Sequence, residues 1–383
     1  MYLFNAQKIR SILDAVPREI KTGDLKEVLV KGIRGEEIPL EDVVVLLRAI
    51  RNEEQFQKVL RTADKIKRKV FGGEVKIYVP VYITNVCANN CFYCGFRKDN
   101  RQIVRSTLTV PEYTREIEFV TGLGHRTIEI VLGYHPVLRG PKLAEYIETT
   151  KSCLALRGGG STILMSEPME EEEYRTHRTA GLDEVYCWLE TYDETIYSKV
   201  HPSGTHKANF NYRLQIFDRV LRAGIKRYGM GILFGLGPYE FDVLSLMDHA
   251  AYLQNTYGIP PYAFGIPRLK KAHGAKMQKP IHRISNREYR LAVAISRIVF
   301  PTAHTYMNTR ENLTLLLQLL KGGGSEINAE ASTRPGGYTE HYLHDGEQFF
   351  HYSYDSKKVL EILKANEMNG CFDEAMSVIV RRQ

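Results

Sequence analysis

Two hydrophobic patterns alternate along most of this 383-residue chain. Short apolar segments rich in β-branched residues predict eight strands, at residues 75–86, 127–132, 161–165, 184–189, 227–234, 262–266, 304–308 and 326–329. Longer segments with helical apolar spacing predict the helices between them, including 111–123, 142–156, 210–223, 241–257, 287–298 and 311–320. Strands that alternate with helices in this way fit an α/β fold, a closed parallel (βα)8 barrel of the TIM type.

The two ends of the chain lack this alternation. Residues 1–72 show helical apolar spacing throughout, and Asp24 can cap a helix that follows it. Residues 355–376 predict one closing helix. We therefore expect an N-terminal helical extension (1–72), a barrel (73–345) and a C-terminal helical tail (346–383).

Composition narrows the class of protein. The chain is 43% hydrophobic and 25% charged, as is usual for a globular protein, and it contains no run of eighteen apolar residues. The start lacks the apolar core of a signal peptide, so we expect a cytoplasmic protein with no membrane partner. The net charge of +7 is modest, and the basic run 65–69 has no interleaved aromatic residues. We therefore expect no nucleic-acid partner.

Three cysteines, Cys87, Cys91 and Cys94, follow the first predicted strand with the spacing C-x3-C-x2-C. Three thiolates at this spacing can hold three corners of a [4Fe-4S] cluster and leave the fourth iron without a protein ligand. A structural zinc site is the alternative. It requires a fourth ligand, and the nearest histidines, His125 and His135, lie outside the run. The spacing favours the cluster.

The cysteine run, with Tyr93 before its last member, resembles the signature of the radical S-adenosylmethionine (SAM) superfamily. In that superfamily the amino and carboxylate groups of SAM chelate the fourth iron, and an electron from the cluster cleaves SAM to a 5′-deoxyadenosyl radical. The resemblance therefore implies two cofactors, a [4Fe-4S] cluster and SAM, with Tyr93 beside them. It also implies an external electron donor such as flavodoxin or ferredoxin.

Three further residues are candidates for binding SAM. Gly133 follows the second predicted strand and is similar to the superfamily element whose backbone binds the SAM amine; a tight turn without a ligand is the alternative. Glu190 follows the fourth strand, where its carboxylate suits the ammonium or ribose of SAM, or else a neighbouring basic side chain. Helix 210–223 carries Arg213 and Arg219, and we assign Arg219 to the SAM carboxylate, with a plain surface role as the alternative.

Arg268 and Arg310 end the sixth and seventh predicted strands. Two guanidinium groups at one barrel mouth suit a small carboxylate-bearing substrate, so we predict both as catalytic-site residues. The alternative is a structural salt bridge, for example between Arg310 and Glu311 or Glu330.

Six segments, 82–97, 190–192, 201–204, 267–269, 309–311 and 335–338, together resemble one branch of the superfamily. That branch contains the tyrosine lyases ThiH and HydG and the maturases HydE and HmdB, and segment 322–330 is most similar to HmdB. The resemblance implies an enzyme that acts on a small carboxylate-bearing molecule in biosynthesis of the iron-guanylylpyridinol cofactor of [Fe]-hydrogenase. HydG-like enzymes carry further C-terminal cysteines for a second cluster, and this chain has Cys371 alone there.

Two alternative functions stay open. The first is a ThiH-like tyrosine lyase of thiamine biosynthesis. Lys270 and Asn308 depart from the ThiH-like pattern, and Lys does not replace Arg at a bidentate site, so we expect SAM cleavage without p-cresol release from tyrosine. The second alternative is an iron–sulfur scaffold or electron carrier, which needs no SAM pocket.

Overall fold

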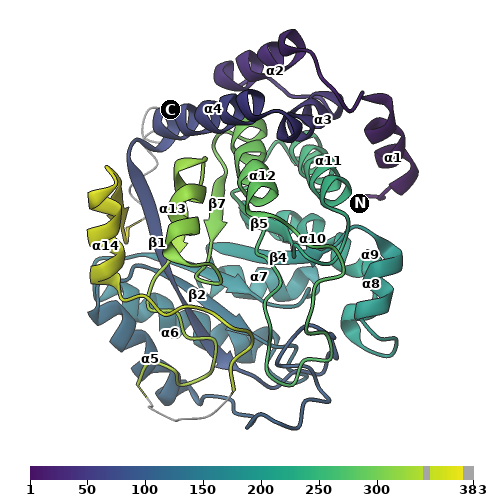
Figure 1. Cartoon of the computed structure of the whole chain (residues 1–383). Helices are drawn as coiled ribbons and strands as arrows, with labels where there is room; N and C mark the ends of the chain where they lie inside the picture. The colour runs from purple at the N-terminus through teal and green to yellow at the C-terminus, as the bar shows by residue number, and fades with distance from the viewer. Residues whose placement is uncertain (340–345, 374–383) are drawn as a thin grey trace.

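The computed structural model describes residues 1–339 and 346–373, and it contains the predicted closed barrel (Figure 1). Its parallel strands are β1 (Glu74–Thr84), β2 (Thr127–Leu132), β3 (Ser161–Met165), β4 (Glu184–Glu190), β5 (Arg227–Ile232), β6 (Ala263–Gly265), β7 (His304–Met307) and β8 (Glu326–Asn328). Each strand pairs with the next, and β1 pairs with both β2 and β8, which closes the sheet. The (βα)8 prediction is confirmed.

Helices surround the barrel: α5 (Val110–Gly122), α6 (Gly140–Ala155), α7 (Glu171–Thr179), α8 (Glu194–Val200), α9 (Phe210–Leu214), α10 (Ile216–Arg222), α11 (Tyr239–Tyr257), α12 (Asn286–Val299) and α13 (Leu313–Lys321). The prediction of one helix over 210–223 was wrong, because the helix breaks at Gln215. Helix α7 was not predicted, since it buries just Tyr174 and His177; a capping box between Glu170 and Glu173 starts it.

The N-terminal segment forms a layer of helices on the barrel. It comprises α1 (Ala6–Ala15), α2 (Thr22–Arg34), α3 (Leu40–Arg48), the 3-10 helix η1 (Ala49–Arg51) and α4 (Glu53–Phe71). Figure 1 shows α2, α3 and α4 together at the top of the view, where α3 contacts α11 and α4 contacts α12. Val43, Leu46 and Phe56 are buried in the same hydrophobic core as the barrel strands. Burial of this apolar surface joins the layer to the barrel.

The C-terminal tail differs from the prediction of a single helix over 355–376. Helix α14 (Ser356–Ala365) ends at Asn366, and β9 (Asn369–Cys371) then pairs in parallel with the start of β1. Glu367 has a positive φ of 59°, so the chain leaves the helical path there. Residues 374–376 lie outside the described residues. No helix within the described ranges is long and apolar enough to cross a membrane.

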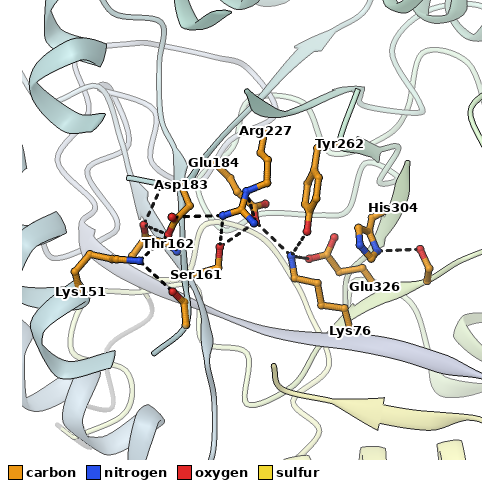
Figure 2. Close-up of polar contacts among 12 residues, drawn as sticks. Lys76, Lys151, Ser161, Thr162, Asp183, Glu184, Arg227, Tyr262, His304 and Glu326 are labelled. Atoms are coloured by element: carbon orange, nitrogen blue, oxygen red, sulfur yellow. Dashed lines mark hydrogen bonds and ion pairs between the residues drawn. The ribbon is translucent and has the colours of Figure 1, made fainter. Parts of the chain in front are cut away.

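Buried polar side chains fill the barrel end at which the strands begin (Figure 2). Lys76 Nζ lies 3.5 Å from Glu184 Oε1 and 3.3 Å from Glu326 Oε1, and it donates to the Tyr262 hydroxyl at 3.3 Å. Arg227 also pairs with Glu184. These opposite charges satisfy one another, so this end of the barrel is closed. Substrates must therefore reach the interior from the opposite end, where the cysteine loop lies.

Candidate active site

The three cysteines lie in the loop after β1 and line one cavity at the carboxyl end of the barrel. Backbone hydrogen bonds fix this loop to its neighbours: Ala88 N donates to Tyr134 O at 2.8 Å, and Phe92 N donates to Val200 O at 3.1 Å. The same cavity is lined by Gly133, Glu190 and Arg310. The structure therefore brings together residues from β1, β2, β4 and the loop after β7.

The surroundings of the three thiols fit a cluster of several irons. All three are free cysteines, and backbone N–H groups point at two of the sulfurs, from Tyr134 to Cys87 Sγ at 3.3 Å and from Phe96 to Cys94 Sγ at 3.4 Å. Such donors stabilise thiolates that ligate a cluster. Within the described residues, no group of three or more His, Cys, Asp or Glu side chains is placed to hold a single metal ion. A structural zinc ion needs four ligands at one point, whereas each cysteine of a [4Fe-4S] cluster binds a different iron.

The electrostatics of the thiols agree with this. Burial, together with the charge of Cys94, raises the pKa of Cys87 to about 12, and burial also raises the pKa of Cys91 and Cys94. Three thiolates this close need positive charge to be stable. Cluster iron supplies that charge, so Cys87, Cys91 and Cys94 are suited to hold the cluster.

Tyr93 and Gly133 both lie at the cavity, as expected from the sequence. The Tyr93 hydroxyl hydrogen-bonds His201 Nε2 at 2.8 Å, so its ring is the part that faces the cavity. A Cβ on Gly133 would lie 2.7 Å from Val86 O and 2.9 Å from the Cys87 Cβ, so the cysteine loop can pack here only against glycine. The binding of SAM by these two residues stays a prediction.

Glu190 belongs to a network of four charges in the cavity wall. Lys207 Nζ lies 2.6 Å from Glu190 Oε1, and Arg213 NH1 lies 2.8 Å from Glu167 Oε2. Lys207 and Arg213 also approach the other carboxylate, at 3.5 and 3.6 Å. Burial opposes ionisation of Glu167, but Arg213 and Lys207 outweigh it and lower its pKa. The salt-bridge alternative for Glu190 is thus observed, and its carboxylate still faces the cavity.

Arg219 is not brought to the cavity. Its Nε donates to Met169 O at 2.9 Å, its NH2 donates to Tyr212 O at 2.6 Å, and its guanidinium stacks on the Tyr212 ring at 4.0 Å. Arg213 reaches the cavity instead. The break at Gln215 places the two arginines on separate helices, so the spacing within one predicted helix gave the wrong choice.

Arg268 and Arg310 also have different positions. Arg268 binds Glu311 with both ends of its guanidinium, at 2.8 and 2.5 Å, and it does not line the cavity. A structural salt bridge to Glu311 therefore exists, but Arg268 makes it and Arg310 does not. Lys270 adds a second cation, 3.0 Å from Glu311.

Arg310 is a half-buried cation that faces the cavity. Its guanidinium lies 3.5 Å over the ring of Phe349, and its Nε is buried without a hydrogen-bond partner. No carboxylate within residues 1–339 and 346–373 pairs with it, and burial lowers its pKa. A desolvated charge of this kind is costly unless an anion is bound. Arg310 is therefore placed to bind the carboxylate of a ligand.

Glu129 was missed from the sequence. It lies inside β2 and is buried in the cavity wall, where both carboxyl oxygens contact the Tyr306 hydroxyl at 2.8 and 2.9 Å. Burial raises its pKa to about 8, so the group is mainly protonated at neutral pH. Tyr306 stacks on Tyr78, with ring centroids 4.5 Å apart. The signal in the sequence was a single carboxylate inside an otherwise apolar strand.

We expect Glu190→Gln to weaken SAM binding by about 1 to 3 kcal/mol, the range for loss of a charge-assisted hydrogen bond. SAM titration of the reconstituted protein measures this, with cluster absorbance showing that the cluster is retained. Glu173→Gln is a matched control, because Glu173 pairs with Arg139 outside this cavity. Equal SAM affinity in both variants would leave Glu190 with a purely structural role.

Comparison with known proteins gives relatives over most of the chain. A family model described as the radical SAM superfamily matches residues 81–250. The 2-iminoacetate synthase of Escherichia coli K12 is 30% identical over 314 residues, which cover 82% of this chain and 81% of that protein. The crystal structure of HydG, a maturase of the [FeFe]-hydrogenase, has a TM-score of 0.90 and 28% identity, covering 98% of this chain and 82% of that chain. Methylornithine synthase (PylB), at 18% identity and a TM-score of 0.73, covers 90% of this chain and 97% of that chain and shares the fold.

Proposed function

Because the chain belongs to the radical SAM superfamily, in the branch that contains 2-iminoacetate synthase and HydG, we propose that it is a lyase of an aromatic α-amino acid. Tyrosine is the first candidate. The observation that carries this proposal is the guanidinium of Arg310, which has no carboxylate partner among the described residues and lies in the same cavity as the three cysteines. Aromatic side chains, among them Tyr78 and Tyr306, form the deep wall of that cavity.

Cys87, Cys91 and Cys94 are the residues to hold the [4Fe-4S] cluster, which when bound supplies the electron that cleaves SAM to methionine and a 5′-deoxyadenosyl radical. The protein's own side chains then position the substrate. Arg310 binds its carboxylate, and the aromatic wall excludes water from its ring. Glu190 lies beside Lys207 with its carboxylate facing the cavity, where it can accept hydrogen bonds from SAM.

The contacts of Glu311 change the argument against tyrosine. From the sequence, Lys270 and Asn308 were expected to face the substrate carboxylate. Lys270 and Arg268 both bind Glu311, and Asn308 Oδ1 accepts a hydrogen bond from the Arg310 backbone at 3.2 Å. Lys270 and Asn308 also line the cavity, so the change from Arg to Lys at position 270 alters both an ion pair within the protein and the cavity wall.

The HmdB-like function rests on the resemblance of segment 322–330 to HmdB. The 30% identity to 2-iminoacetate synthase supports the ThiH-like alternative. The scaffold or electron-carrier alternative is disfavoured by Arg310 and Glu129, since a cluster carrier has no use for a polar pocket beside its cysteines.

Substrate-dependent SAM cleavage tests the proposal. The reconstituted protein is reduced with dithionite, and 5′-deoxyadenosine is measured with L-tyrosine, with tyramine or with no addition. We expect L-tyrosine to stimulate cleavage, and tyramine, which lacks the carboxylate, to leave the rate unchanged. Equal rates in all three reactions would contradict the proposal.

The titration of Glu129 has a predictable effect on stability. Burial raises its folded-state pKa from 4.5 to about 8, so its contribution to folding is complete below pH 4.5 and is lost as the pH rises through 8. Glu129→Gln keeps a neutral hydrogen-bonding group and removes this titration. We expect the melting temperature of the variant to rise relative to the wild type between pH 5 and pH 8. Parallel curves over that range would show that Glu129 does not titrate as described.

A further inference from the structure

The loops around the cysteine loop carry a large excess of basic residues. Segment 270–283 contains five lysines and arginines and no carboxylate, and segment 97–101 contains three against Asp99 alone. From these segments and the end of α8 we define a basic rim. Its members are Lys98, Arg101, Lys199, Lys276 and Lys279.

Direct contacts place the basic rim around Phe92, the residue after Cys91. Met277 N donates to Phe92 O at 2.7 Å, and Lys276 Nζ lies 4.1 Å over the Phe92 ring. Val200, next to Lys199, accepts a hydrogen bond from Phe92 N. Lys98 N donates to Asn89 O at 2.8 Å within the same loop. Three basic segments that are distant in sequence therefore meet at the cysteine loop.

The five side chains of the basic rim are exposed, and none forms an ion pair with a carboxylate of the described part of the chain. Exposed cations without an ion pair to a described carboxylate also occur elsewhere, for example Lys26 on α2 and Lys65 on α4. The basic rim differs because its segments meet at the cysteine loop. Uncompensated like charges repel one another and create a positive potential over this surface. Phe92 is half-buried at its centre, so the cysteine loop reaches the surface there.

We propose that the basic rim is the docking surface for an acidic electron-donor protein of the flavodoxin or ferredoxin class. Opposite charge steers such a donor to the Phe92 face, where its redox centre comes close to the three cysteines. The donor loses one electron, the cluster gains it, and no bond forms or breaks at this surface. This inference rests on the proposed function because it requires that the three cysteines hold a cluster. A nucleic acid fits less well. Single-stranded nucleic acids stack their bases on several aromatic side chains, and Phe92 is the single aromatic residue among Phe92 and the five members of the basic rim.

The first test is binding. Oxidised flavodoxin is titrated into the wild-type holoprotein, into Lys276→Glu/Lys279→Glu and into a control, Lys26→Glu/Lys65→Glu. The control changes the net charge equally at exposed positions on α2 and α4. We expect the rim variant to bind flavodoxin at least roughly tenfold more weakly than the wild type does. Its affinity should also depend less on salt concentration, because charges around an interface attract the partner before contact. The control should bind like the wild type.

The second test separates docking from catalysis. With dithionite as reductant, SAM cleavage by the rim variant should equal that of the wild type, and with reduced flavodoxin it should be slower. Lys98→Glu/Arg101→Glu should reproduce this pattern without disturbing the Lys276 contact to Phe92. SAM cleavage with reduced flavodoxin at the wild-type rate in both rim variants would overturn the docking inference, and the dithionite reaction shows that the site of each variant is intact.

Two other outcomes would also overturn it. One is equal flavodoxin affinity in the rim variants, the control and the wild type. The other is tighter binding of a DNA oligonucleotide than of flavodoxin. A wild-type protein that binds flavodoxin but cleaves no SAM with dithionite would contradict the proposed function, not the docking surface.

Discussion

Replacing Cys87, Cys91 or Cys94 by Ala is expected to abolish the absorption of the [4Fe-4S] cluster and the formation of 5′-deoxyadenosine together. We expect each cysteine to ligate one iron, and the described residues place no further Cys, His, Asp or Glu to form a single-ion site with them. An Ala variant therefore has no substitute ligand at that corner.

Absorption spectroscopy, iron content and 5′-deoxyadenosine yield after anaerobic reconstitution measure this effect. Cys153→Ala is the matched control, because Cys153 is a buried thiol of α6 that does not line the cavity. It should retain both the cluster and the activity. A full cluster in any one of the three Ala variants would remove that cysteine from the assignment.

Arg310→Gln is expected to lower kcat/KM for tyrosine-dependent SAM cleavage by roughly a hundredfold or more. Loss of one partner of a desolvated charge pair costs about 2 to 5 kcal/mol. Arg310→Lys should also be impaired, since an ammonium group cannot bind a carboxylate through two parallel hydrogen bonds. SAM cleavage without substrate should be unchanged in both variants.

Thermal stability distinguishes this role from a structural one. Arg310 has no carboxylate partner among the described residues and contacts Phe349 and Arg268 O, so Arg310→Gln should lower the melting temperature less than Arg268→Gln does. Arg268→Gln is the matched control. It removes the two contacts to Glu311, and we expect it to lower the melting temperature. The opposite pattern, with stability lost in Arg310→Gln and substrate affinity lost in Arg268→Gln, would contradict the assignment.

Local patterns of the sequence were sufficient to predict the barrel and the cysteine loop. The strands are rich in apolar residues because both of their faces are buried, and the three cysteines are neighbours along the chain. Helix α7 and strand β9 were missed because neither has a clear local pattern. Helix α7 has little apolar periodicity, and β9 is a three-residue strand defined by its pairing with β1.

The partners of the charged residues could not be predicted, because they come from distant segments. Glu190 pairs with Lys207 from the 3-10 helix η2 (His206–Ala208), and Glu167 after β3 completes that network. The choice between Arg268 and Arg310 depended on which of them reaches Glu311, and adjacency in sequence suggested the wrong one. Glu129 did carry a local signal, since a buried strand seldom contains an unpaired carboxylate.

Product analysis with L-tyrosine tests whether this protein is a tyrosine lyase. The reconstituted protein is incubated with SAM, a reductant and L-tyrosine, and p-cresol is quantified against 5′-deoxyadenosine. In this lyase reaction the 5′-deoxyadenosyl radical takes one hydrogen atom from tyrosine and the Cα–Cβ bond breaks. One part of tyrosine leaves as 2-iminoacetate, and the cresol fragment gains one electron from the reductant and one proton from water to give p-cresol. We expect the amount of p-cresol to rise in proportion to the amount of 5′-deoxyadenosine. We expect no p-cresol from the Arg310→Gln variant. SAM cleavage with all of the tyrosine recovered intact would contradict it and would favour the HmdB-like function.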